Sequence, residues 1–106
     1  MNPTKACVVM TTVSSKEQAE KIARAVLEAR LAACVQIQKI TSYYWWDDKI
    51  NREGEQLLYL KTTADKYQAL EALLIANHSY DTPEILQLPV ERGLEKYLSW
   101  MQKETG

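Results

Sequence analysis

The sequence predicts an α+β fold in which the elements follow the order strand, helix, strand, strand, helix, strand, with a further helix at the end. Three observations support this order. Residues 5–12 form an apolar, β-branched run, the periodicity changes from helical to strand-like between residues 33 and 63, and two more helical stripes flank a proline-containing loop. The 106 residues, of which 46% are hydrophobic, suit a single domain over residues 1–106.

The first helix is predicted to follow the strand at residues 5–12. Ser14 and Glu17 have the spacing of a capping box, in which Ser14 accepts from the backbone N–H of Glu17. The apolar positions behind them follow helical spacing, and the helix is expected to end near Leu31. These positions are Ala19, Ile22, Ala23, Val26 and Leu27.

A long hairpin is predicted next, from two strand-like stretches at residues 34–46 and 55–62. Asp47 and Asp48 have the chemistry of a turn, and Gly54 is expected to form a bulge in the returning strand. The tip of the hairpin carries four consecutive aromatic residues, Tyr43, Tyr44, Trp45 and Trp46.

The second half of the chain completes the pattern. A helix with Asp65 in its first turn has one apolar face, and residues 78–83 form a loop because Pro83 disfavours helix at Thr82. A last strand is expected at residues 84–90. The apolar faces of the second and the terminal helix are formed by Tyr67, Leu70, Leu73 and Leu74, and by Leu94, Tyr97, Leu98 and Met101.

This order is the ferredoxin-like arrangement, in which right-handed crossovers place both helices on one face of a four-stranded antiparallel sheet. The other face should then be polar, yet residues 6–10 and 57–60 are apolar on both sides. A bare apolar sheet face favours aggregation. We therefore expect this face and the aromatic tip of the hairpin to be buried in an oligomer.

Composition argues against several functions. The 13 basic and 14 acidic residues form no basic stripe, so we expect no nucleic-acid partner. Neither a membrane span nor a signal peptide is apparent, which predicts a cytoplasmic protein. Cys7 and Cys34 both lie in apolar runs and are expected to be reduced thiols, not bonded to each other.

Five motifs, in order along nearly the whole chain, resemble the CutA family of divalent-cation tolerance proteins. They are residues 31–35 (LAACV), 44–50 (YWWDDKI), Glu55 with Lys61-Thr62, 78–85 (HSYDTPEI), and 88–90 (LPV) followed by Gly93 and 97–100 (YLSW). The resemblance implies a homotrimer that provides tolerance of copper and other divalent metals in the cytoplasm. The chain departs from the family pattern at two positions. Ser79 takes the place of a Pro in the family, and Asp48 takes the place of a Gly.

The resemblance also implies a copper site built from a Cys in the first strand and two adjacent His after the second helix. These positions correspond to Met10, Asn77 and His78, of which only His78 is retained, so weaker copper binding is expected. The alternative is an ordinary histidine at a helix C-terminus, where a partial positive charge suits the helix dipole.

A second candidate site is a cleft between subunits formed by Glu55, Lys61, Tyr80 and Glu84, because polar residues on a core strand need partners. An interface salt bridge is the simpler alternative to a catalytic role. No nucleophile has an adjacent base, and three Gly provide no phosphate-binding loop, so an enzyme is not expected.

We therefore consider three functions. A metal-binding homotrimer for divalent-cation tolerance comes first. A trimeric small-molecule sensor of the PII-like kind, with ligands in the clefts between subunits, and a structural or assembly protein are the alternatives.

Overall fold

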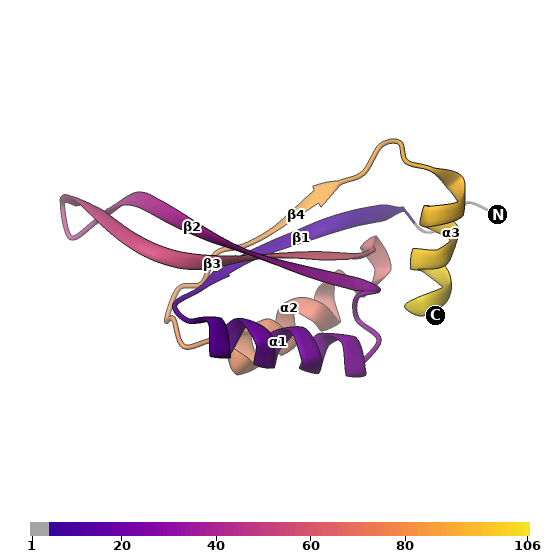
Figure 1. Cartoon of the computed structure of the whole chain (residues 1–106), viewed down its shortest axis with the longest axis horizontal. Coiled ribbons are helices and arrows are strands. Elements are labelled where there is room, and N and C mark those ends of the chain that lie inside the picture. The colour runs from indigo at the N-terminus through magenta and orange to yellow at the C-terminus, as the bar shows by residue number, and fades with distance from the viewer. Residues whose placement is uncertain (1–4) are drawn as a thin grey trace.

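The computed structural model describes residues 5–106 and has the predicted element order. It runs β1 (Ala6–Val13), α1 (Lys16–Glu28), β2 (Cys34–Trp46), β3 (Lys49–Thr63), a 3₁₀ turn η1 (Ala64–Lys66), α2 (Tyr67–Asn77), β4 (Ile85–Pro89) and α3 (Glu95–Glu104). The β2–β3 hairpin extends far beyond the helices on one side, and α3 lies at the opposite end of the sheet (Figure 1).

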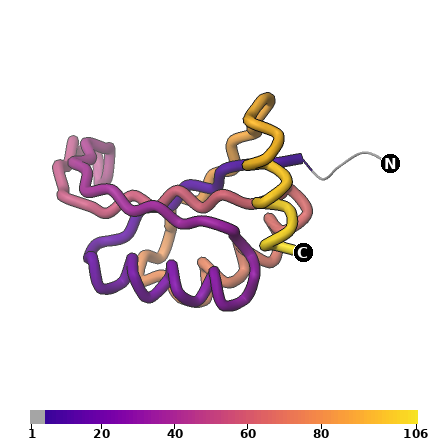
Figure 2. The backbone as a smooth tube through the Cα atoms, turned by 45° about the vertical axis from the view of Figure 1, so that its right-hand side comes forward, coloured from indigo at the N-terminus to yellow at the C-terminus, as the bar shows by residue number. Residues whose placement is uncertain are grey.

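The four strands form one antiparallel sheet in the order β2-β3-β1-β4, as the ferredoxin-like arrangement requires. Helices α1 and α2 lie side by side beneath one face of the sheet (Figures 1 and 2). The core lies between these two layers. It includes Cys7, Val9 and Val13 of β1, Leu58 and Leu60 of β3, Ile22 and Val26 of α1, and Leu70 and Leu74 of α2.

The N-terminus of α1 differs from the prediction by one residue. The N-cap is Ser15, whose hydroxyl accepts from the backbone N–H of Gln18 at 3.2 Å, and not Ser14. Gln18 does not complete a capping box. Its side-chain amide instead donates to the carbonyl of Asn77 and accepts from the Ser79 hydroxyl, which ties the start of α1 to the end of α2.

The end of α1 and the bounds of α2 and α3 also differ from the prediction, by smaller amounts. Helix α1 ends at Glu28, earlier than Leu31, and Arg30 then takes a left-handed φ of 59°. Asp65 lies in the 3₁₀ turn before α2. The apolar stripe of α3 is covered mainly at Met101, whereas Leu94 precedes the helix and is exposed.

The hairpin is longer and more regular than predicted. Strand β3 begins at Lys49, and its register with β2 continues without interruption through Gly54, which pairs with Thr41, so the expected bulge is wrong. Asp47 and Asp48 form the two-residue turn with φ of 56° and 57°. Two successive residues with positive φ define the turn type that best matches the twist of a hairpin.

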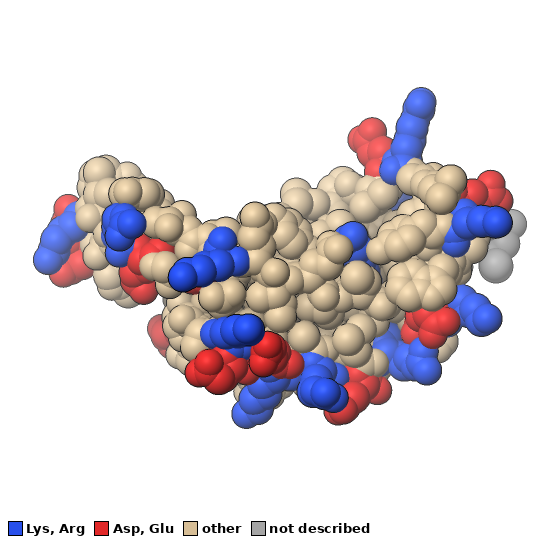
Figure 3. Space-filling view, in the orientation of Figure 1, with Lys and Arg blue, Asp and Glu red and all other residues tan. Residues whose placement is uncertain are grey.

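The sheet face that points away from the helices is apolar along β1 and β4, as predicted for β1, whereas β2 and β3 also place Gln36, Gln38 and Lys61 on it. Alternation along a strand places Val8 and Met10 of β1, Leu57 of β3, and Leu86 and Leu88 of β4 on this side. Leu86 and Leu88 remain 53% and 47% exposed. Charged side chains gather along α1 and near the hairpin tip, and leave much of the surface between the hairpin and α3 uncharged (Figure 3).

Cys7 and Cys34 are free thiols on strands that flank β3, opposite Thr62 and Lys61 respectively. Two strand spacings separate them, which exceeds the reach of a disulfide. No helix among residues 5–106 is long and apolar enough to cross a membrane.

Candidate functional site

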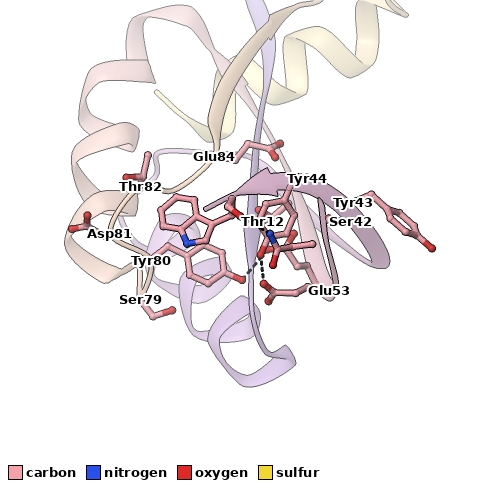
Figure 4. Close-up of a pocket in the computed structure, with 13 residues that line it drawn as sticks. Thr12, Ser42, Tyr43, Tyr44, Glu53, Ser79, Tyr80, Asp81, Thr82 and Glu84 are labelled. Carbon is pink, nitrogen blue, oxygen red and sulfur yellow. Dashed lines mark hydrogen bonds between the residues drawn. The ribbon is translucent and has the colours of Figure 1, made fainter. Parts of the chain in front are cut away.

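A cavity of about 760 Å³ lies where the hairpin leaves the body of the sheet. One wall is the hairpin, the other is the loop between α2 and β4, and the floor is the end of β1 (Figure 4). The lining residues are Thr12, Ser42, Tyr43, Tyr44, Trp46, Asn51, Glu53, Glu55, Ser79, Tyr80, Asp81, Thr82 and Glu84.

The alternation of the hairpin strands selects which residues enter this cavity. Ser42 pairs with Glu53 and Tyr44 pairs with Asn51, so these side chains share one face of the hairpin with Glu55. This face is continuous with the apolar face of the sheet. The cavity wall is therefore a direct consequence of the uninterrupted register through Gly54.

The four aromatic residues of the hairpin tip do not form one patch. Trp45 points to the opposite face from Tyr44 and Trp46, because neighbouring residues in a strand alternate. Tyr43 is directly opposite Arg52, whose Nε donates to the Tyr43 hydroxyl at 3.2 Å. Trp45 is 72% exposed, and Trp46 is 64% exposed but lines the cavity.

His78 fastens the loop to β1. Its Nε2 lies 2.8 Å from the carbonyl oxygen of Thr12, and its Nδ1 accepts from the backbone N–H of Tyr80 at 3.1 Å. A carbonyl oxygen can only accept and a backbone N–H can only donate, so these contacts require a neutral imidazole with the proton on Nε2. Both ring nitrogens are thus occupied.

Tyr80 and Glu55 connect the two walls of the cavity. The Tyr80 hydroxyl donates to Glu55 Oε2 at 2.8 Å, and the Glu55 side chain is almost fully buried. Burial, followed by this hydrogen bond and the negative charge of Glu55, raises the pKa of Tyr80 well above its usual range. Nearby, the Tyr44 hydroxyl donates to Glu53, a hydrogen bond that raises the pKa of Tyr44.

The cavity is acidic. Glu53, Glu55, Asp81 and Glu84 line it, and among residues 5–106 no Lys, Arg or His does so. Figure 4 shows the Tyr80 ring pointing inward, whereas Asp81 and Glu84 lie on the loop at the rim. Within residues 5–106, no three His, Cys, Asp or Glu side chains converge closely enough to hold a metal ion.

The family-aligned copper residues Met10, Asn77 and His78 do not form a prepared metal site. The Asn77 amide donates to the carbonyl of Leu73 at 2.9 Å, and His78 has no free nitrogen. A metal could reach His78 only by displacing the Tyr80 N–H from Nδ1. Asn77 and His78 already use these groups for hydrogen bonds within the chain, so the three residues are not arranged as copper ligands.

Of the four residues predicted for the second site, three lie together in the cavity and one does not. Glu55, Tyr80 and Glu84 line the same cavity, whereas the Lys61 amine lies 5.6 Å from the centre of the Tyr97 ring, beside α3. Sequence reasoning missed Thr12 and Glu53. The strand alternation that places Tyr44 and Glu55 on one face could have identified Glu53, because it lies two residues before Glu55.

A family model described as the CutA1 divalent ion tolerance protein matches residues 7–104. The chain belongs to this family. Among its relatives is the divalent-cation tolerance protein CutA of Thermus thermophilus, 43% identical over 100 residues that cover 93% of this chain and 97% of that protein. The chloroplastic CutA 1 of rice is 41% identical over 99 residues, which cover 92% of this chain. This chain spans only 56% of the rice protein's length.

Solved CutA structures have the same fold. The periplasmic divalent cation tolerance protein CutA of Archaeoglobus fulgidus superposes with a TM-score of 0.93 at 39% identity, over 95% of this chain and 99% of that chain. The Thermus thermophilus protein gives a TM-score of 0.92 at 42% identity with the same coverage. The predicted ferredoxin-like α+β fold is thereby confirmed.

Proposed function

We propose that this chain acts as one domain over residues 1–106 in divalent-cation tolerance, as a cytoplasmic, non-enzymatic homotrimer that binds copper. The observation that carries the proposal is an uncovered apolar surface on a member of the CutA1 family. The open sheet face exposes Leu86 and Leu88, and at the hairpin tip Trp46 is exposed on the same side and Trp45 on the opposite side.

Assembly follows from the physics of that surface. Soluble monomers rarely expose large contiguous apolar patches, and exposed aromatic side chains are common anchors of protein interfaces. The hairpin also exposes Tyr43 and Ile50, at 68% and 66%. A second and third copy packed on this surface would remove it from water and stabilise a small core by association.

Native mass spectrometry of untagged protein purified without added metal tests the assembly and any bound ion together. We expect a complex of three 12.2 kDa chains at micromolar concentration. A stable monomer under these conditions would contradict the proposal.

Copper is the cation to test first, because the family resemblance implies it. Coordination by His78 costs the hydrogen bond from Tyr80 N–H, so we expect weak binding. Calorimetric titration with Cu²⁺ at about neutral pH should show a component that is absent in His78→Ala. Met10→Leu should affect only Cu⁺, which prefers sulfur ligands. Identical isotherms for the wild type and His78→Ala would rule out His78 as a ligand.

Support for a non-enzymatic role comes from the state of the reactive groups. Burial, and to a lesser extent the charge of Asp65, raise the pKa of the Cys7 thiol, which opposes formation of the nucleophilic thiolate. His78, the only histidine, has both nitrogens occupied.

A small-molecule sensor is the second candidate, and the cavity that contains Glu55, Tyr80 and Glu84 favours it.

A further inference from the structure

We propose that, in the homotrimer, the outer face of one copy's hairpin tip packs on an exposed stripe of α3 in the next copy. The outer face is formed by Tyr43, Trp45 and Ile50, and the α3 stripe is formed by Leu94, Tyr97 and Trp100. The inference rests on the proposed trimer and adds to it the two surfaces that meet.

The hairpin tip exposes side chains that would belong to the core in the body of the sheet. Strand alternation places Tyr43, Trp45 and Ile50 on the side of the sheet that carries the helices, and Trp45 lies directly opposite Ile50. The hairpin extends beyond α1 and α2, so all three side chains remain largely exposed (Figure 1). Within residues 5–106, the tip therefore lacks the helix layer that covers the rest of this face.

Helix α3 carries a matching exposed stripe. Leu94, Tyr97 and Trp100 are three residues apart, which places them along one face of the helix. The centres of the Tyr97 and Trp100 rings lie 5.5 Å apart, whereas Met101 is buried against the rest of the chain. Leu94 is 73% exposed and Trp100 is 41% exposed. The stripe can therefore supply the helix layer that the hairpin tip of another copy lacks.

The two surfaces lie too far apart to meet within one chain. The molecule is 49 Å long, with the hairpin tip at one end and α3 at the other (Figures 1 and 2). A contact between two different surfaces of identical chains can repeat around a closed ring. In such a ring every hairpin tip and every α3 stripe is covered.

Charge supports the same pairing. Lys61 lies beside the stripe, with its amine 5.6 Å from the centre of the Tyr97 ring, and it forms no ion pair within residues 5–106. The two acidic and two basic residues at positions 91–96 balance each other, so Lys61 adds an uncompensated positive charge there. Residues 47–53 of the hairpin carry three acidic and two basic side chains. Opposite net charges at the two surfaces favour this orientation of the copies.

Native mass spectrometry of the full-length protein over a dilution series tests the contact. Trp45→Ala and Trp100→Ala should each raise the concentration at which half of the trimer dissociates by at least about tenfold, because each removes an aromatic anchor. The double variant should dissociate about as readily as the less stable single variant, since both changes remove the same contact. The control is Ile75→Ala, an exposed apolar residue on α2, which should change this concentration less than about twofold.

Cross-linking identifies the contacting surfaces directly. In a Cys34→Ser background, Ile50→Cys and Tyr97→Cys place one thiol on each surface, while Cys7 stays buried. A short bismaleimide should then link chains into species of two and three times 12.2 kDa. If the two substitutions are made on separate, co-expressed chains, the products should stop at two chains. A trimer that yields no cross-linked chains would contradict the contact.

An unchanged trimer in both Trp100→Ala and Leu94→Ser would overturn the proposal, as would effects of Trp45→Ala and Trp100→Ala that add fully in the double variant. Leu94→Ser keeps the test valid if Trp100→Ala fails to fold, because Leu94 precedes the helix and serine is a favoured N-cap residue. A monomeric wild type would contradict the proposed trimer itself. An intact trimer that is insensitive to the α3 variants would count only against this contact.

Discussion

At the scale of single residues, the hydroxyl of Tyr80 donates the hydrogen bond that the buried Glu55 carboxylate accepts. Tyr80→Phe should destabilise the protein by about 1.5–3 kcal/mol, the range for a hydrogen bond to a charged group. Urea unfolding would measure the change. Tyr59→Phe is the matched control, because its hydroxyl donates to the neutral, exposed side chain of Gln38 and its loss should cost about 1 kcal/mol or less.

The same tyrosine makes stability depend on pH at the alkaline end. Its pKa is raised in the folded state, first by burial and then by Glu55, so the folded protein holds the phenolic proton more tightly than the unfolded chain. This contribution is complete below the unfolded pKa of about 10 and is lost as the pH rises above it. Tyr80→Phe should therefore show a shallower loss of stability above about pH 10.

His78 illustrates what a residue type alone cannot reveal. A lone histidine after a helix suggests a metal ligand or a favourable charge at the helix end, and neither alternative predicts contacts to Thr12 and Tyr80. Those contacts depend on the path of the loop between α2 and β4. That path carries no local sequence signal.

At the scale of elements, the start of α1 can be tested directly. Ser15→Ala should destabilise the protein by about 1 kcal/mol, because it removes the hydroxyl that accepts from Gln18 N–H. Ser14→Ala should have little effect, since Ser14 is exposed and lies outside the helix. Chemical denaturation of both variants measures the difference. A larger effect at Ser14 would contradict the observed cap.

The order of the elements could be predicted because hydrophobic periodicity is a local property of the sequence. The length of β3 could not be predicted, since residues 49–54 are mainly polar, include a glycine and gain their strand conformation from pairing with β2.

For the cavity, polar residues in apolar surroundings indicated Glu55 and Tyr80. Thr12 carries no such signal, because a threonine in a strand is unremarkable until the loop covers it.

At the scale of the whole molecule, the hairpin exposes Trp45 on one face and Trp46 on the other, so each tryptophan can be tested as an anchor of the proposed trimer. Trp45→Ala should weaken the trimer, because exposed tryptophans that become buried at an interface typically contribute about 2 kcal/mol or more. Trp46→Ala tests the face that continues into the open sheet face and should also weaken the proposed trimer. Native mass spectrometry over a dilution series compares the two. If Trp45→Ala dissociates no more readily than wild type, the outer face of the hairpin is not an interface.

The elongated shape, 49 by 26 by 22 Å, arises because the hairpin continues where the third strand ends. Strand β1 pairs with β3 only as far as Val13 and Gln56, so residues 40–55 form a two-stranded ribbon with two open edges. Such a ribbon is only marginally stable in isolation.

Amide hydrogen exchange should therefore show a boundary at this point. Amides of β3 between β1 and β2, such as those of Leu58 and Leu60, should exchange only through global unfolding. Amides of the ribbon should exchange orders of magnitude faster in any dissociated chain. Their slowing with rising protein concentration would report, residue by residue, which parts of the ribbon a neighbouring chain covers.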